Sequence, residues 1–200
     1  MDFFEYKKDE LFCEDVNLIE IAENFGTPTY VYSSKTLDLH IDAYMDSFTS
    51  KDYQICFSVK SNSNKVLLRE IGKLGLGADV VSIGELMKAI SSGIKPKNIV
   101  FSGVGKTPDE LRYAINKKIL LINAESKSEI LEIEKISIMN NKKVSVGLRV
   151  NPDTDAKTLS QISTGKKENK FGISEKSIFG PVSYTHLRAH ETSLHLVCRL

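Results

Sequence analysis

The sequence has few of the residues that mark exported, metal-binding or membrane proteins. Its 200 residues include no tryptophan, three cysteines and four histidines. The cysteines, Cys13, Cys56 and Cys198, are too few and too scattered for a disulfide framework or a cysteine zinc site. No apolar run reaches the roughly eighteen residues of a membrane helix, and "MDFFEYKKDE" lacks the apolar segment of a signal peptide. We therefore predict reduced cysteines, no metal, no membrane partner and a cytoplasmic location.

No excess of one charge is present either. The chain has 27 basic and 26 acidic residues, interleaved along its length, for a formal net charge of +1. Such a balance does not attract nucleic acid or an anionic membrane surface, so we discount both as partners. The hydrophobic content of 41% is ordinary for a folded domain, and a sizeable core is therefore possible.

Short β-branched or apolar runs recur from residue 54 onward. Amphipathic stretches separate them at a spacing of roughly 20–25 residues, which is typical of βα units in a parallel sheet. The runs are residues 54–60, 78–82, 98–103, 119–124 and 143–151. No Gly-x-Gly-x-x-Gly follows the first run, and this favours a (β/α) barrel over a dinucleotide-binding sheet. The predicted fold class is α/β, a partial (β/α)8 TIM barrel.

Helix-start signals follow several of these runs. In each, a Ser or Thr precedes a Glu by three residues, the spacing of a capping box. The pairs are Ser82 and Glu85, Thr107 and Glu110, and Ser126 and Glu129. Apolar residues at helical spacing follow two of them and predict helix faces that lie against the sheet: Leu111, Ala114 and Ile115, then Ile130, Ile133, Ile136 and Ile138.

The chain divides into three predicted parts. Residues 1–33 form an N-terminal leader with a strand at 5–13, a helix at 18–26 and a strand at 29–33. Residues 34–181, which open with a helix from 34 to about 50, form the barrel. Eight strands need about 250 residues, so a barrel with about five strands between residues 54 and 180 is incomplete.

Residues 182–200 differ in character from the rest of the chain. They read "VSYTHLRAHETSLHLVCRL" and contain three of the four histidines, two arginines and no lysine. The stretch resembles translated adapter sequence, and we interpret it as non-native. Its "HETSLH" places two histidines five residues apart, whereas a zinc-binding H-E-x-x-H needs four, so we predict no zinc site.

Lys60 is the candidate reactive residue. With a period of two, Cys56, Ser58 and Lys60 share one face of the first barrel strand, and Lys60 is its last residue. Barrel enzymes place reactive groups at the carboxyl ends of their strands, and a desolvated lysine there can bond to an aldehyde or ketone. The alternative is a lysine that only extends its amine into solvent from a strand end.

Three further residues are candidates for the same site. Arg149 faces inward on the fifth strand, where an arginine needs either a structural carboxylate or a substrate or cofactor phosphate. Asp79, in the second strand, is either a site carboxylate or a buried partner of Lys60 or Arg149. Glu85 is either a site residue or simply part of its capping box.

The segment "FSVKSNSNKVLLREIGKLGLGADVVSIGEL" (57–86) resembles the cofactor-lysine region of the alanine-racemase-like, fold-type III decarboxylases that use pyridoxal 5'-phosphate. Residues 4–33, 99–111 and 148–174 are similar to the diaminopimelate decarboxylase branch of that family. The resemblance implies that Lys60 holds pyridoxal phosphate covalently and that Asp79, Glu85 and Arg149 lie around the cofactor. It also implies a leader strand that belongs to a C-terminal β-domain, and a homodimer for the full-length enzyme.

The implied reaction converts meso-2,6-diaminopimelate, a small amino-acid substrate, to L-lysine and carbon dioxide. Leu159, Ser160 and Gln161 replace a His-Pro-Tyr-like triplet of the family, so the contacts of that triplet are not carried over to this chain. The family's phosphate loop, the acidic partner of the pyridine nitrogen and the β-domain would lie beyond residue 180, so we expect the 200-residue chain itself to be inactive. The alternatives are an ornithine, arginine or carboxynorspermidine decarboxylase, a racemase, a non-catalytic pyridoxal-phosphate barrel, or a βα protein without catalytic function.

Overall fold

The structure is a computed structural model that describes residues 3–49, 52–151 and 172–174. The chain forms two compact units, Met1–Tyr53 and Gln54–Leu200. In the described part, no helix is both long and apolar enough to span a membrane.

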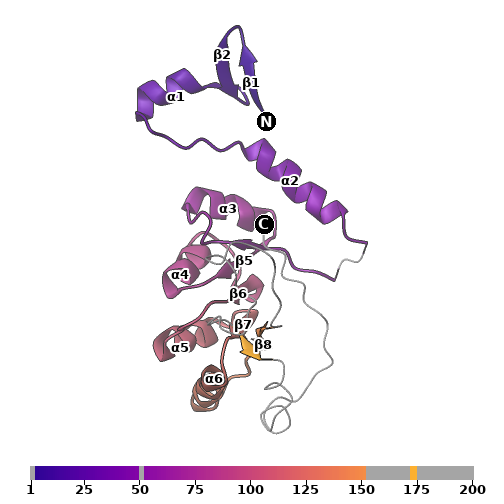
Figure 1. Cartoon of the computed structure of the whole chain (residues 1–200), viewed down its shortest axis with the longest axis vertical. Coiled ribbons are helices and arrows are strands. Elements are labelled where there is room, and N and C mark those ends of the chain that lie inside the picture. The colour runs from indigo at the N-terminus through magenta and orange to yellow at the C-terminus, as the bar shows by residue number, and fades with distance from the viewer. Residues whose placement is uncertain (1–2, 50–51, 152–171, 175–200) are drawn as a thin grey trace. The chain divides into compact units, whose positions relative to one another are not determined.

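The first unit is a small antiparallel sheet followed by two helices (Figure 1). Its elements are β1 (Phe4–Lys7), β2 (Glu10–Cys13), β3 (Val16–Asn17), α1 (Leu18–Phe25) and α2 (Ser34–Asp46). Lys8 and Asp9 join β1 to β2 with φ values of 51° and 69°, as expected for a two-residue hairpin whose turn matches the strand twist. The predicted strand at 5–13 is therefore a hairpin, and the two predicted helices are confirmed, the second ending at Asp46.

The strand predicted at residues 29–33 is wrong. These residues are all described, and they have no regular secondary structure. Tyr30 and Tyr32 are 89% and 66% exposed, so the face that carries the two aromatic side chains packs against nothing. A high β-propensity does not make a strand unless a neighbouring strand supplies hydrogen-bond partners and a packing surface.

The second unit is a parallel sheet whose strands alternate with helices (Figure 1). Its strands are β4 (Cys56–Ser58), β5 (Gly77–Val80), β6 (Ile99–Phe101), β7 (Leu121–Ala124) and β8 (Val146–Leu148). Between them lie α3 (Lys65–Lys73), α4 (Ile83–Ser91), a 3-10 turn (Pro96–Asn98), α5 (Pro108–Lys117) and α6 (Lys127–Met139). A short parallel pair, β9 (Val150–Asn151) and β10 (Ile173–Ser174), completes the described elements.

The order of the strands decides the type of sheet. The five strands lie in the order β4-β5-β6-β7-β8, so each new strand joins the same edge. A doubly wound, dinucleotide-binding sheet instead reverses direction at a switch point. The sequential order is that of a barrel wall, and the five predicted strand positions are confirmed.

The core lies between this sheet and its helices. Ala78, Val80, Ile99, Phe101 and Ile122 are fully buried in the strands. The helix faces predicted to contact the sheet are buried, with one exception: Ile138 is 72% exposed. Its prediction was wrong because Ile138 follows the buried Ile136 by two residues, a rotation of about 200° around the helix, and so lies on the opposite face of α6.

The capping prediction is confirmed in part. Thr107 and Glu110 form the complete box, in which each side chain accepts from the other residue's backbone N–H. Ser82 and Ser126 also cap their helices, accepting from the N–H groups of Glu85 and Glu129. The Glu85 and Glu129 carboxylates, however, accept from the residue before the cap, Val81 and Glu125 respectively.

Candidate functional site

Lys60 lies two residues beyond the last residue of β4, at the carboxyl end of the sheet. The last ladder contact before it is the N–H of Val59, which donates to the carbonyl of Asp79 at 3.0 Å. Val59 is fully buried, whereas Lys60 is exposed. In the part of the chain that the structure describes, no hydrogen bond or ion pair holds the Lys60 amine, so it is available to react.

The strand face before Lys60 is small and polar. Cys56 and Ser58 are buried on β4, and Ser58 is paired in register with Asp79 of β5. The Ser58 hydroxyl is buried and has no hydrogen-bond partner among the described residues. A buried hydroxyl without a partner is uncommon, and it marks a place where a water molecule or a bound group can contribute a contact.

Asp79 is held by a chain of side chains that crosses three strands. The Ser102 hydroxyl, just after β6, donates to Asp79 Oδ1, and Asn123 Nδ2 of β7 donates to Ser102 Oγ at 3.1 Å. Asp79 is 3% exposed. The prediction that Asp79 is a buried partner of Lys60 or Arg149 is wrong, because the Ser102 hydroxyl and not a cation contacts its carboxylate.

Gly147 leaves the room that this chain needs. A Cβ at Gly147 would lie 2.3 Å from Asn123 Oδ1, far closer than two such atoms can approach. Gly147 of β8 is paired in register with Asn123 of β7. Asn123 can therefore turn its amide along the sheet toward Ser102 only because β8 has no side chain at this position.

Arg149 has a structural carboxylate partner. Its Nη1 lies 2.9 Å and 3.2 Å from the two carboxylate oxygens of Glu125, which is 5% exposed. The same carboxylate accepts from the N–H of Gly103 at 3.1 Å. Of the two partners considered for an inward arginine, the carboxylate is the one observed, and it fixes Arg149 at the carboxyl end of the sheet just after β8.

Glu85 is engaged at the start of α4. Its Oε2 accepts from the N–H of Val81 at 2.8 Å, and its own N–H donates to the Ser82 hydroxyl. These contacts account for a glutamate at this position by helix capping. Lys60, Asp79, Glu85 and Arg149 thus all lie at or next to the carboxyl ends of strands β4, β5 and β8.

Five further polar residues belong to this region: Glu129, which was predicted only as a capping residue, and Ser102, Lys106, Asn123 and Glu125, which were not predicted. All five lie at the end of β6 or β7 or in the first turns that follow, where a parallel sheet gathers polar groups. Lys106 is 1% exposed in its side chain, and Glu129 is 9% exposed. Their position after predicted strands was the available signal, but their mutual contacts depend on the fold.

Cys56 is a buried thiol beside the Asp79 carboxylate. Burial, and to a lesser extent the negative charge of Asp79, together raise the pKa of Cys56 from 9.0 to about 12. The Sγ atom contacts the carbonyl oxygen of Asn98 at 3.7 Å. The thiol is therefore protonated at neutral pH and is not a nucleophile.

We expect iodoacetamide to alkylate Cys56 roughly a thousandfold more slowly in the folded chain than in denaturant at pH 8, because the thiolate fraction falls tenfold per pKa unit. Residue-resolved mass spectrometry measures both rates. Because the folded pKa is the higher one, the unfolded state loses its proton first, so this contribution to stability is lost as pH rises from 9.0 to about 12. Equal alkylation rates in the two states would contradict the assignment.

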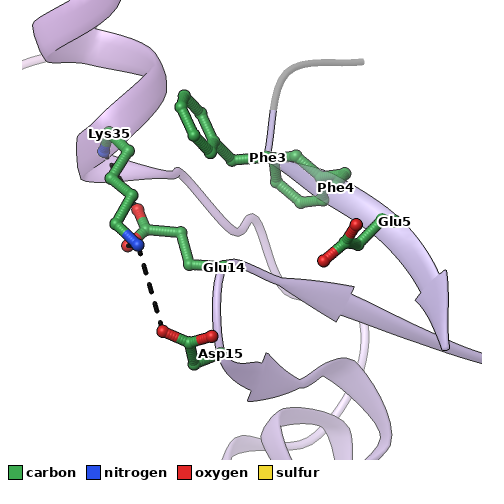
Figure 2. Close-up of a pocket in the computed structure, with 6 residues that line it drawn as sticks. All are labelled: Phe3, Phe4, Glu5, Glu14, Asp15 and Lys35. Carbon is green, nitrogen blue, oxygen red and sulfur yellow. Dashed lines mark hydrogen bonds and ion pairs between the residues drawn. The ribbon is translucent and has the colours of Figure 1, made fainter.

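A hollow of about 280 Å³ in the first unit is lined by Phe3, Phe4, Glu5, Glu14, Asp15 and Lys35 (Figure 2). Lys35 Nζ lies 3.9 Å from Asp15 Oδ2 and 3.9 Å from Glu14 Oε2. Glu14 also accepts from the Lys35 N–H and the Ser33 hydroxyl, and these bonds lower the pKa of Glu14. The lining residues carry three carboxylates and one ammonium, and the third carboxylate, that of Glu5, pairs with Lys7 at 3.1 Å, so the hollow does not suit an anionic cofactor.

Parallel strands in sequential order, with a lysine, carboxylates and an arginine at their carboxyl ends, define the enzyme class of (β/α)-barrel proteins. Residues 35–197 match the model of the family described as pyridoxal-dependent decarboxylase, pyridoxal binding domain. The chain belongs to this family. The match continues past residue 182, and the origin of residues 182–200 stays a prediction.

Curated relatives indicate which members of this family the chain is similar to. The chain is 47% identical over 173 residues to diaminopimelate decarboxylase of Pseudomonas aeruginosa. The aligned region covers 86% of this chain and 42% of the relative. The chain is 46% identical over 171 residues to diaminopimelate decarboxylase of Aquifex aeolicus, covering 86% of this chain and 40% of the relative. The chain thus spans about two fifths of the length of these relatives.

Solved structures give the same result. The crystal structure of diaminopimelate decarboxylase from M. jannaschii matches with a TM-score of 0.80 and 37% identity over 88% of this chain and 42% of that one. The enzyme from Helicobacter pylori, in complex with L-lysine, matches with a TM-score of 0.77 and 42% identity over 80% of this chain and 41% of that one. The fold predicted from the sequence, a partial barrel of the fold-type III enzymes, is confirmed.

Some sequence predictions lie outside the described residues. They concern Leu159, Ser160 and Gln161, most of the segment 148–174, and the histidine-containing residues 182–200.

Proposed function

We propose that this chain is the cofactor-binding part of a diaminopimelate decarboxylase, which removes carbon dioxide from meso-2,6-diaminopimelate and releases L-lysine. The observation that carries the proposal is the Lys60 amine at the carboxyl end of β4, which has no hydrogen-bond or ion-pair partner among the described residues, inside a chain with 47% identity to such an enzyme. Two solved relatives were crystallised with L-lysine, which is the expected product.

The residues present fit pyridoxal phosphate. An amine with no partner among the described residues is what an aldehyde cofactor needs for covalent attachment. The small side chains of Cys56 and Ser58 leave space beside it, and the buried Ser58 hydroxyl still has a hydrogen bond to offer. Arg149 supplies N–H donors for an anionic oxygen, in an orientation that Glu125 fixes.

When bound, the cofactor serves as the electron sink for the charge that departing carbon dioxide leaves behind. Lys60 would hold the cofactor and, once its amine is released, would carry protons to and from the reacting carbon. Asp79 would keep a negative charge fixed near the ring, because Ser102 and Asn123 hold its carboxylate in place. The full-length enzyme would act as a homodimer.

The second candidate is another amino-acid decarboxylase of the same fold. The crystal structure of arginine decarboxylase from Paramecium bursaria Chlorella virus also matches this chain, with a TM-score of 0.64 and 25% identity over 80% of it and 41% of that chain. The lower score and identity favour diaminopimelate over arginine as the substrate class.

A substrate comparison tests the proposal. The full-length protein, loaded with pyridoxal phosphate, is incubated separately with meso-diaminopimelate, ornithine, arginine and carboxynorspermidine, and carbon dioxide release is measured. We expect kcat/KM for meso-diaminopimelate to exceed the others by at least about a hundredfold, since a polar site rejects a substrate that leaves its groups unpaired. Faster release from another amino acid would assign the chain to that decarboxylase, and epimerisation without carbon dioxide would make it a racemase.

A further inference from the structure

Lys106 is a buried lysine that takes no part in the proposed chemistry. It lies after β6 and directly before Thr107, the cap of α5. Its ammonium donates to three oxygens: the carbonyls of Gly103 and Asn123, at 2.6 and 2.7 Å, and Glu129 Oε1 at 2.7 Å. One charge therefore joins the loop after β6, the end of β7 and the first turn of α6.

These contacts close into a ring. The Gly103 carbonyl accepts from Lys106, while the Gly103 N–H donates to the Glu125 carboxylate at 3.1 Å. The Glu125 N–H in turn donates to Glu129 Oε2 at 3.2 Å, and Glu129 Oε1 returns to Lys106. Every link of the ring is a hydrogen bond between two of these four residues, so none can shift without breaking a contact of its neighbours.

Arg149 attaches to this ring through Glu125. The Glu125 carboxylate accepts both from the ring and from Arg149 Nη1. The side chains contribute two positive and two negative charges, so the cluster is neutral as a whole. The Arg149 side chain keeps 27% of its area exposed, so it lies within reach of a ligand at the carboxyl end of the sheet.

Stability alone does not explain a lysine at this position. A buried ion pair can often be replaced by apolar residues of similar volume with little loss of stability, because removing two charges from water is costly. An apolar side chain cannot hold two carbonyls and a carboxylate in fixed directions. Fixed directions are what a site needs when an arginine must stay within a fraction of an ångström of its place.

We propose that Lys106 and Glu129 are positioning residues, which act through the Glu125 carboxylate to hold Arg149 in its binding orientation at the carboxyl end of the sheet. The ligand that Arg149 would contact is an anionic group of the cofactor or substrate, and this last point rests on the proposed function. The role of Lys106 and Glu129 in fixing the position of Arg149 does not depend on the proposed function.

The reactivity of Arg149 tests this role without any ligand. Phenylglyoxal is applied to the full-length protein with its cofactor removed, and mass spectrometry gives the rate of modification at Arg149. Lys106→Met should raise that rate about tenfold, equivalent to about 1.4 kcal/mol, because the Glu125 carboxylate loses its support. Exposed Arg69 on α3 serves as the internal reference and should not change.

A double-mutant cycle separates positioning from loss of stability. Glu125→Gln should raise the Arg149 rate by itself, and Lys106→Met should add nothing in that background, because contacts in one network are not additive. Leu111→Ala, which removes a buried side chain of α5 outside the ring, should lower the melting temperature and leave the Arg149 rate unchanged.

An unchanged rate in Lys106→Met, or rate increases that multiply in the double variant, would overturn the proposal. If Lys106→Met does not fold, the Arg149 modification rate in Glu129→Gln tests the proposal instead. This substitution keeps the shape of the side chain and removes its charge. The wild-type protein is also titrated with pyridoxal phosphate. Failure to bind would end the proposed function, whereas the Arg149 rates would still decide the positioning role.

Discussion

Replacing Lys60 with alanine is expected to abolish decarboxylation by the full-length protein. A residue that both holds a cofactor and moves protons contributes at least about 10²–10⁴-fold to the rate. Among the described residues, Lys106 also lies near the strand ends, but it is buried and donates to three oxygens, so it cannot substitute. Carbon dioxide release from meso-diaminopimelate measures the loss.

Lys65→Ala is the matched control. Lys65 is exposed at the first position of α3, five residues from Lys60, and its loss should leave the rate within about twofold of wild type. Borohydride reduction in the presence of pyridoxal phosphate should place the label on Lys60 in the wild-type and Lys65→Ala proteins. A label on another lysine, or a Lys60→Ala enzyme with near-normal activity, would refute the assignment.

Gly77→Ala is expected to cause a large loss of stability. A Cβ on this first residue of β5 would lie 2.1 Å from the backbone oxygen of Asn98 and 2.8 Å from Cys56 Sγ. The Asn98 carbonyl is backbone and cannot turn away, so the strand must shift. Overpacking of this kind costs about 1–3 kcal/mol. At roughly 2–4 °C per kcal/mol, the melting temperature should fall by several degrees, which calorimetry measures.

Gly84→Ala makes the same chemical change but is expected to raise the melting temperature. Gly84 is exposed in the first turn of α4, and the nearest atom to an added Cβ is Ser82 Oγ, 3.9 Å away. Alanine should stabilise the helix there by up to about 1 kcal/mol. If both variants changed the melting temperature in the same direction, close packing at Gly77 would not be the cause of its effect.

The strands of the second unit could be predicted because each lies in a short apolar run, and several of these runs are followed by a helix-start signal. Phe101 and Ile122 lie in β-branched or apolar runs, and helix-cap residues such as Thr107 follow soon after. Spacing between runs then limits the fold to a few topologies. The same reasoning failed at residues 29–33, where the pattern is present and the partner strand is not.

The candidate site could be predicted only in its outline. Lys60, Asp79 and Arg149 were found because the sequence pattern puts each in a predicted strand or at its end, and strand ends meet at one edge of a parallel sheet. Glu125 as the partner of Arg149 could not be found, because the two are 24 residues apart and follow different strands. From the sequence alone, a lysine such as Lys106 is expected on the surface, and its burial is explained only by the three acceptors that the fold brings to it.

The sequential order of β4 to β8 has a consequence for synthesis. Every strand from β5 to β8 pairs with the strand that left the ribosome just before it, so a growing sheet needs no segment that is still untranslated. Contacts between near neighbours in the chain form quickly, whereas translation adds only about 5–20 residues each second. The wall of this barrel can therefore assemble while the polypeptide is still being made, one βα unit at a time.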